Sequence, residues 1–249
     1  IFQNEDGSTR IISIWDQSTD FGNPPDGFTY GSEFTREQIN LALQSDNPLE
    51  IVPSIDEVGH GTMIAGIAGG NEVPESNFYG IATDAEFVIV KLKPAKQYLK
   101  RFFFVPEDAV AFQENDVGFG LEYLLSMHTK LNRPMAICIG VDTSQRSHDG
   151  RGTLSNQVSL YAANDGIAII LPAGNEGNAR RHYYEIIDET IGFNTVELNV
   201  GENVSGFSME LWGQRPNTFS VDITSPSGEY IPRLLITRDE FREVTFIFE

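Results

Sequence analysis

Short apolar runs alternate with amphipathic stretches along most of the chain. The runs that predict strands lie at 10–15, 86–92, 135–141 and 166–171. The stretches with apolar residues at three and four spacing, which predict helices, lie at 35–44, 106–128 and 154–165. Uniformly apolar strands that alternate with helices are typical of a parallel sheet covered by helices on both faces. The pattern therefore predicts an α/β fold.

Two of these helices carry start signals, and small residues mark a further one. Thr35 and Gln38 have the spacing of a capping box, and Pro106 suits the first position of the long helix. The stretch 57–70, EVGHGTMIAGIAGG, has glycine or alanine on several faces. A helix with so little side chain lies very close to neighbouring backbone, so we expect it to be buried in the centre of a domain.

The pattern changes near residue 194, where alternating strands separated by turns replace the helices. These strands are predicted at 195–200, 206–213, 218–224, 229–237 and 243–249. We therefore expect an α/β body at 1–190, followed by a partial β-rich domain at 191–249. The last strand is still running where the chain stops, and the chain begins without Met. On these grounds we expect an internal piece of a longer protein.

The charge is strongly acidic, with 36 acidic against 17 basic residues and a net charge of −19. Such a surface repels phosphate and anionic lipid, which argues against nucleic acid and membrane surfaces as partners. No apolar run reaches the ~18 residues that a membrane span needs. Cys138 is the only cysteine, so no internal disulfide forms, and its apolar run predicts a buried strand residue.

Two motifs suggest catalytic chemistry. His60 stands between Gly59 and Gly61 at the head of the small-residue helix. The partial positive charge of a helix N-terminus favours the neutral imidazole, which suits a general base for a serine nucleophile. Asn175, flanked by Gly174 and Gly177, follows an apolar strand and suits a donor to an oxyanion. A dinucleotide-binding glycine loop is disfavoured, because the apolar strand it needs is replaced by the polar PSIDEV.

These motifs resemble those of the subtilisin-like serine proteases (peptidase S8). GHGTMIAGIAGG is similar to their active-site histidine motif, and PAGNEG is similar to their oxyanion-asparagine motif. The resemblance implies that His60 is the general base and Asn175 the oxyanion-hole donor. It also implies a parallel α/β sheet, a peptide or protein substrate, and a propeptide in the full-length protein. No cofactor and no metal are implied.

Further stretches resemble the clostridial Csp-type subtilases, the group that contains the spore-germination proteases. They include NEDGSTRIISIWDQS, YGSEFTREQIN, NPLEIVPSIDEVGHGT, VKLKPAK, SHDG and SMELWG. The resemblance implies that 191–249 begin an inserted, jelly-roll-like domain. It further implies a protein that is secreted or associated with the bacterial spore.

The chain departs from the family pattern at two members of the triad. The nucleophile motif, which begins G-T-S, is absent, and in the family it lies beyond the inserted domain. Asp16 is followed by Gln17 and Ser18 rather than by Thr or Ser and then Gly. In Csp-type relatives a W-D-Q sequence lies downstream of the triad aspartate. We therefore place that aspartate before residue 1 and keep Asp16 as the minority candidate.

The substrate groove of the family implies a further set of positions. The family's S-L-G strand corresponds here to Gly140, Val141 and Asp142 in CIGVDTSQ. The resemblance thus assigns substrate binding to Ile139, Gly140, Val141 and Gly174. Asp142 in the place of a glycine would narrow the groove or favour a basic side chain.

Other polar candidates are assigned to structure or surface. His128, His148 and His182 lack the spacing of metal ligands. Asp56 and Glu57 are interpreted as a solvated turn, and the basic run KLKPAKQYLKR as a solvated edge. Two functions follow from the resemblance: part of a serine endopeptidase, inactive on its own, or a Csp-type pseudoprotease that binds or signals in germination.

Overall fold

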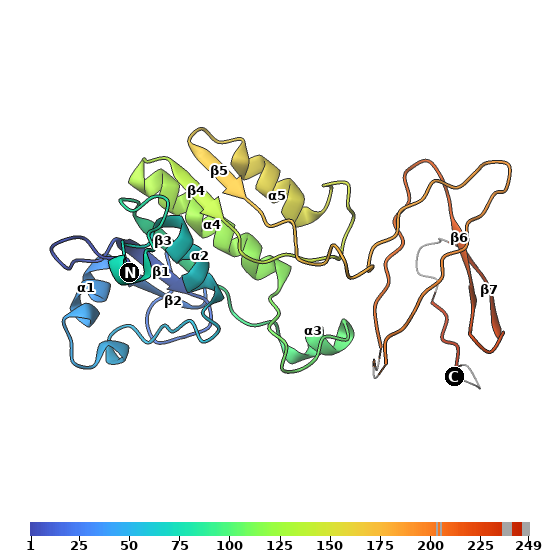
Figure 1. Cartoon of the computed structure of the whole chain (residues 1–249), viewed down its shortest axis with the longest axis horizontal. Coiled ribbons are helices and arrows are strands. Elements are labelled where there is room, and N and C mark those ends of the chain that lie inside the picture. Colours follow the sequence, from blue (N-terminus) through green and yellow to red (C-terminus); the bar gives the residue numbers. More distant parts are fainter. Residues whose placement is uncertain (203, 205, 236–240, 246–249) are drawn as a thin grey trace. The chain divides into compact units, whose positions relative to one another are not determined.

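The computed structural model describes residues 1–202, 204, 206–235 and 241–245. The chain divides into two compact units, Ile1–Ser208 and Met209–Glu249. The sequence predicts a boundary between an α/β body and a β-rich domain at 190/191, and this domain boundary remains a proposal. The strands and helices of the first unit (Figure 1) are β1 (Ile11–Asp16), β2 (Ser32–Thr35), α1 (Arg36–Leu43), η1 (Pro48–Glu50), α2 (His60–Gly69), η2 (Pro74–Ser76), β3 (Phe87–Lys91), α3 (Gln97–Phe102), α4 (Glu114–Leu131), β4 (Met135–Cys138), α5 (Thr153–Ala162) and β5 (Ile167–Ile170).

Parallel pairing dominates the strands of the first unit, as the apolar runs predict. β1 pairs with β3 and β4 pairs with β5, both in parallel, which confirms the α/β fold. β2 is an addition, because it pairs antiparallel with the other edge of β1. Its sequence, Ser-Glu-Phe-Thr, lacks the continuous apolar run by which the other strands were recognised.

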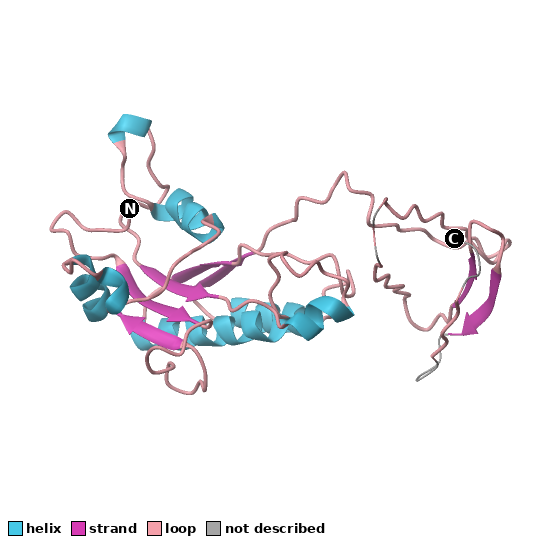
Figure 2. Ribbon diagram, turned by 90° about the horizontal axis from the view of Figure 1, so that it is seen from below, coloured by secondary structure: helices cyan, strands magenta, loops and turns pink. Residues whose placement is uncertain are grey.

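Helices α2 and α4 lie on opposite faces of β3. A Cβ at Gly69 of α2 would lie 2.9 Å from the Phe87 ring, and one at Gly120 of α4 would lie 3.2 Å from Val90. Phe87 and Val90 are three positions apart on one strand, so their side chains point to opposite faces. Figure 2 shows the strands between these two helices. At this strand the expected cover on both faces is therefore present.

The pair β4–β5 is covered less completely. Ile137 is only 3% exposed, and α5 packs beside β5. The alternate positions Ala136 and Cys138 are exposed, so within the described residues this face of β4 is open. The expectation that Cys138 is buried is therefore wrong. The apolar run correctly indicated a strand but not which of its faces is covered.

The core centres on Trp15, Tyr123 and Met127, which join β1 to α4. The two aromatic rings are 5.3 Å apart between centroids. The buried Tyr123 hydroxyl shares a hydrogen bond of 2.8 Å with Ser13 Oγ and donates one of 2.7 Å to Glu33 Oε1. These contacts bind α4 to both β1 and β2.

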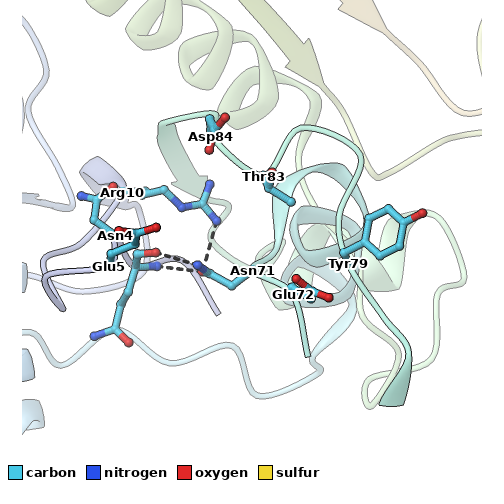
Figure 3. A pocket seen from close by; sticks show the side chains of 9 residues that line it. Asn4, Glu5, Arg10, Asn71, Glu72, Tyr79, Thr83 and Asp84 are labelled. Carbon is cyan, nitrogen blue, oxygen red and sulfur yellow. Dashed lines mark hydrogen bonds between the residues drawn. The ribbon is translucent and has the colours of Figure 1, made fainter. Parts of the chain in front are cut away.

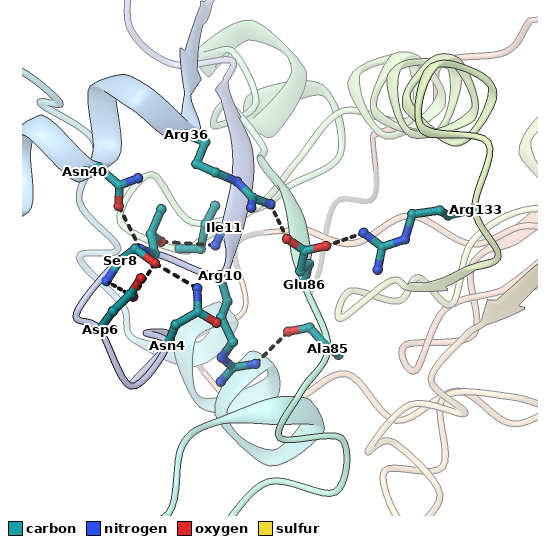
Figure 4. Close-up of polar contacts among 11 residues, drawn as sticks. Asn4, Asp6, Ser8, Arg10, Ile11, Arg36, Asn40, Ala85, Glu86 and Arg133 are labelled. Carbon is teal, nitrogen blue, oxygen red and sulfur yellow. Dashed lines mark hydrogen bonds and ion pairs between the residues drawn. The ribbon is translucent and has the colours of Figure 1, made fainter.

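An ion-pair cluster fixes the start of β3. The Glu86 carboxylate accepts hydrogen bonds from Arg36 of α1 and from Arg133, which precedes β4 (Figure 4). The hydrogen bond from Arg133 is the main reason that the pKa of Glu86 lies below its usual value. One carboxylate thus connects three segments that are distant in sequence.

The long helix begins later than predicted. α4 starts at Glu114 and not at Pro106, although the capping box of α1 is confirmed at Thr35 and Gln38. Lys100 is 7% exposed, and its ammonium donates to the carbonyl oxygens of Glu107 and Ala109 at 3.0 and 2.6 Å. Those carbonyls are turned toward Lys100, and residues 106–113 form a turn and bend at 107–109 and a loop with an isolated bridge between Phe112 and Pro94.

The basic run is a solvated edge only in part, since Lys96 and Arg101 are exposed but its other three lysines are not. Besides Lys100, two of its lysines form ion pairs with buried carboxylates. Lys91 lies 3.3 Å from Asp16, and Lys93 lies 3.0 Å from Asp116. The run also includes most of α3, which the sequence pattern did not reveal.

The second unit contains an antiparallel pair, β6 (Ser220–Thr224) and β7 (Tyr230–Leu235). This confirms two of the predicted strands. No strand forms at 195–200 or at 206–213, where the structure describes loop. Of the last predicted strand, 243–245 are loop and 246–249 lie outside the described residues.

The Tyr123 hydroxyl is expected to stabilise the first unit. Tyr123→Phe would leave Ser13 and Glu33 without this partner and lower the free energy of unfolding by about 1–2 kcal/mol. The measurement is urea unfolding followed by Trp15 fluorescence in a Trp212→Phe background. Tyr98→Phe is the control, because Tyr98 is 62% exposed. Equal effects of the two substitutions would contradict the assignment.

Candidate active site

His60 is the first residue of α2, and an aspartate fixes the turn that precedes it. Gly59 has a φ of +80°, which places the chain in the left-handed region before the helix. Asp56 accepts hydrogen bonds from the Gly59 and Thr62 amides at 2.8 and 2.9 Å, and from the Thr62 hydroxyl at 2.8 Å. Asp56 is therefore a helix cap and not merely a solvated residue.

Helix α2 is less buried than its small residues suggested. Its buried positions are Gly66 and Gly69, while Met63 and Ile67 are 55% and 54% exposed. His60 is exposed as well. A Cβ at Gly69 would lie 2.6 Å from the carbonyl oxygen of Ala82, which shows how close the covered face approaches neighbouring backbone. The expected central burial is therefore wrong for the described residues.

The segment that follows β4 touches both candidate catalytic segments. A Cβ at Gly140 would lie 2.6 Å from Ile64 and 3.8 Å from Cε1 of His60. A Cβ at Gly174 would lie 2.6 Å from the Asp142 carboxylate. Only glycine fits these two close approaches without a shift of the neighbours. The structure thus brings Gly140 beside His60, and Asp142 beside the residue that precedes Asn175.

Asn175 lies in an exposed bend beyond the carboxyl end of β5. The Ile139 amide donates to the Ile170 carbonyl at 3.0 Å, which extends the contact between the two strands by one residue. Beyond it, Gly140 and Val141 leave the ladder and are half-buried. Within the described residues the other edge of β4 has no strand partner. Such an edge offers backbone groups to an extended peptide.

A cavity of about 520 Å³ lies beside this segment. Its lining residues come from the loops after β4 and β5: Asp142, Thr143, Ser144, His148, Ala173, Gly174, Glu176, Gly177, Arg180, Arg181 and His182. His148 and His182 stack with ring centroids 4.7 Å apart, and Arg181 pairs with Glu176 at 2.9 Å. Neither sequence segment contains a signal that these two distant histidines would meet.

Asp16 is fully buried at the end of β1. Its carboxylate contacts residues other than His60. Its Oδ1 accepts from the Ser18 amide and hydroxyl at 2.8 and 2.5 Å, and its Oδ2 accepts from Ser54 Oγ at 2.7 Å. No hydrogen bond or ion pair joins it to His60 among the described residues. Burial raises the pKa of Asp16, but the hydroxyls of Ser18 and Ser54 outweigh it and hold the pKa below its usual value.

A second cavity, of about 600 Å³, lies at the opposite end of α2 (Figure 3). Arg10, 3% exposed, lies at its wall and donates to the carbonyl oxygens of Gly69 and Ala85, both at 2.6 Å. It also donates to Asn71 Oδ1 at 3.2 Å. Arg10 thus holds the last residue of α2 against the start of β3.

The remaining polar candidates have local contacts. His128 Nδ1 lies 2.8 Å from the Arg133 carbonyl oxygen, after the end of α4. Within the described ranges, no three His, Cys, Asp or Glu side chains form a group suited to a metal ion. No described helix is both long and apolar enough to cross a membrane.

Comparisons with known proteins indicate the family and the fold of the chain. Residues 46–229 match the model of the subtilase family, peptidase S8. Among solved structures, the CspB protease of Clostridium perfringens is similar, with 27% sequence identity and a TM-score of 0.71. The similarity covers 95% of this chain and 46% of that one, so the chain spans about half the length of its structural relative. No curated protein matches the chain in sequence.

Removal of the Asp56 side chain is expected to weaken the start of α2. Asp56→Ala should lower the free energy of unfolding by about 1 kcal/mol at neutral pH, as for other lost helix caps. The Thr62 hydrogen bonds hold the pKa of Asp56 below its ordinary 3.8. The stabilisation is therefore complete above 3.8 and is lost as the pH falls through the lower, folded-state value.

The measurement is urea unfolding over this pH range, with Asp46→Ala as a control on an exposed turn. A difference between wild type and Asp56→Ala that stays constant down to the lowest pH would contradict the capping role.

Proposed function

The chain belongs to the subtilase family, and on that premise we propose that it is part of a subtilisin-like serine endopeptidase. The carrying observation is the close approach of Gly140 to His60 and of Asp142 to Gly174. One short segment thereby connects the candidate base to the candidate oxyanion donor. Active sites of open α/β sheets gather at the carboxyl ends of the strands, where this segment lies.

His60 is proposed as the general base. A serine hydroxyl would lose its proton to the imidazole as its oxygen attacks the peptide carbonyl, and the imidazolium would then protonate the leaving amine. The exposed position of His60 at the start of α2 supports this role, because the ring is open to a substrate and a nucleophile. Its backbone is held by the turn that Asp56 caps.

Asn175 is proposed as the donor to the oxyanion. Its amide would bind the negative oxygen of the tetrahedral intermediate, which is bound more strongly than the ground-state carbonyl. The positive φ of Gly174, +80°, turns the chain just before Asn175 and supports this placement.

The other two members of the triad are proposed to lie outside these 249 residues. The serine motif of the family is absent from the sequence, and the structural relative is about twice as long. The contacts of Asp16 with Ser18, Ser54 and Lys91 support an upstream aspartate as the triad acid.

The substrate is proposed to be a peptide or protein segment that pairs in extended form beside Ile139, Gly140 and Val141. Gly174 would form the opposite wall, and Asp142 would favour a basic side chain in the adjoining cavity. We further propose that 191–249 begin an inserted jelly-roll-like domain, that the longer protein carries a propeptide, and that it is secreted or spore-associated.

A pseudoprotease with the same fold is the second candidate, acting as a binding or signalling protein in spore germination. The observation in its favour is that, within the described ranges, the His60 imidazole forms no hydrogen bond with another side chain. An intact triad in the longer protein would exclude it. A full-length sequence with no aspartate before residue 1 or no serine after residue 249 in the family motifs would favour it.

The 249-residue chain alone is expected to hydrolyse no peptide and to take no label from a fluorophosphonate probe, because the proposed nucleophile is not among its serines. Mass spectrometry after exposure to the probe is the measurement. Stoichiometric labelling of any one serine in the chain would contradict the assignment of the nucleophile.

In the longer enzyme, Asn175→Ala is expected to lower kcat by about 100- to 1000-fold, because it removes one oxyanion donor. KM should change little, since the interaction forms in the transition state. Asn178→Ala, in the same loop, is the control and should leave kcat near wild type. A loss confined to KM would indicate that Asn175 only binds substrate.

A further inference from the structure

Asp16 and Lys91 are register partners at the carboxyl ends of β1 and β3. The Asp16 side chain is 1% exposed and that of Lys91 is 25% exposed, and they lie 3.3 Å apart. A carboxylate at this depth is stable only when donors meet both oxygens. Asp16 has such donors on each oxygen, and they belong to different segments of the chain.

The two oxygens of Asp16 have different roles. In the part of the chain that the structure describes, Oδ1 accepts only from Ser18, two residues ahead, and forms a local turn. Oδ2 accepts from Ser54 Oγ at 2.7 Å and faces Lys91. Lys91 Nζ lies 3.5 Å from Glu57 as well. The sheet therefore contacts the segment that leads into His60 both through Oδ2, with Ser54, and through Lys91, with Glu57.

The Ser54–Asp16 hydrogen bond and the Lys91–Glu57 ion pair differ in strength. Glu57 is 73% exposed, and ion pairs of this kind contribute little because water screens them. The Ser54 hydrogen bond is to a buried, charged acceptor, which makes it the stronger one. Ser54 lies two residues before Asp56, the cap of α2. A fixed Ser54 therefore limits where Asp56 and the following turn can lie.

We propose that Asp16 is a positioning residue for His60: it anchors Ser54, and with it the capped turn that presents the imidazole. This inference rests on the proposed function for its catalytic meaning, but the anchoring itself is independent of peptidase activity. Asp16 touches neither His60 nor the reacting atoms, so it is not assigned to catalysis. Because Ser54 and Ser18 donate to different oxygens of Asp16, the anchoring of Ser54 can be tested separately from the general contribution of Asp16 to stability.

The test uses the 249-residue chain and matched variants of the residues that donate to the two carboxylate oxygens of Asp16. Ser54→Ala removes the donor to Oδ2, whereas Ser18→Ala removes one donor to Oδ1. We expect Ser54→Ala and Asp16→Asn to speed hydrogen exchange at the Gly59 and Thr62 amides by about tenfold, through local opening. Ser18→Ala should leave these two amides unchanged.

A spectroscopic signature of His60 completes the test. The NMR signal of its Cε1–H group at one fixed pH should shift in Asp16→Asn and Ser54→Ala, and not in Ser18→Ala. If Asp16→Asn fails to fold, Ser54→Ala and Ser18→Ala still decide the question. Equal effects of these two variants, or none from Ser54→Ala, would overturn the proposal.

Activity separates this proposal from the proposed function. In the longer enzyme, Ser54→Ala should lower kcat and leave KM unchanged. An inactive wild-type enzyme with the expected exchange pattern would refute the peptidase and leave the anchoring intact. An active enzyme with unchanged exchange and unchanged kcat in Ser54→Ala would refute the anchoring alone.

Discussion

A buried carboxylate must be met by donors on both oxygens, and this requirement organises the carboxyl edge of the β1–β3 pair. Burial of Asp16 would raise its pKa and favour the neutral acid, yet the hydroxyls of Ser18 and Ser54 and the charge of Lys91 keep it ionised. Lys91 ends β3 and Ser18 lies two residues beyond β1, but Ser54 belongs to the segment that precedes α2. The Asp16 carboxylate thus has all of its donors only when the segment before His60 is in place.

The register of the parallel strands determines which helices can reach this edge. Phe87 and Val90 point to opposite faces of β3, toward Gly69 of α2 and Gly120 of α4. Glycine at both helical positions lets the helix backbones approach the strand closely. α4 is further held by the Trp15–Tyr123 contact, so the sheet and α4 form the packed base on which the more exposed α2 lies.

Local signals could be recognised in the sequence, whereas long-range contacts could not. The capping box of Thr35 and Gln38 needs only four consecutive residues and was correctly predicted. The start of α4 was misplaced because Pro106 is a valid helix start by itself, and the contacts of Lys100 with Glu107 and Ala109 depend on a separate helix. Cys138 shows the same limit: an apolar run indicates a strand, but its burial depends on what covers each face.

At the site, family motifs marked His60 and Asn175, while the stacking of His148 on His182 has no signature in either segment.

Helix α2 is held at both ends by side chains whose charges match its dipole. Asp56, an anion, accepts from the Thr62 amide in its first turn, and Arg10, a cation, donates to the carbonyl of Gly69 at its end. Each interaction of a charge with a helix end contributes about 0.3–1 kcal/mol, and more when it is partly buried, as Arg10 is. Side-chain burial holds α4 in place. Since much of α2 is exposed, its position depends more on these contacts at its ends. The orientation of His60 therefore depends on polar contacts at the helix ends more than on apolar packing along its length.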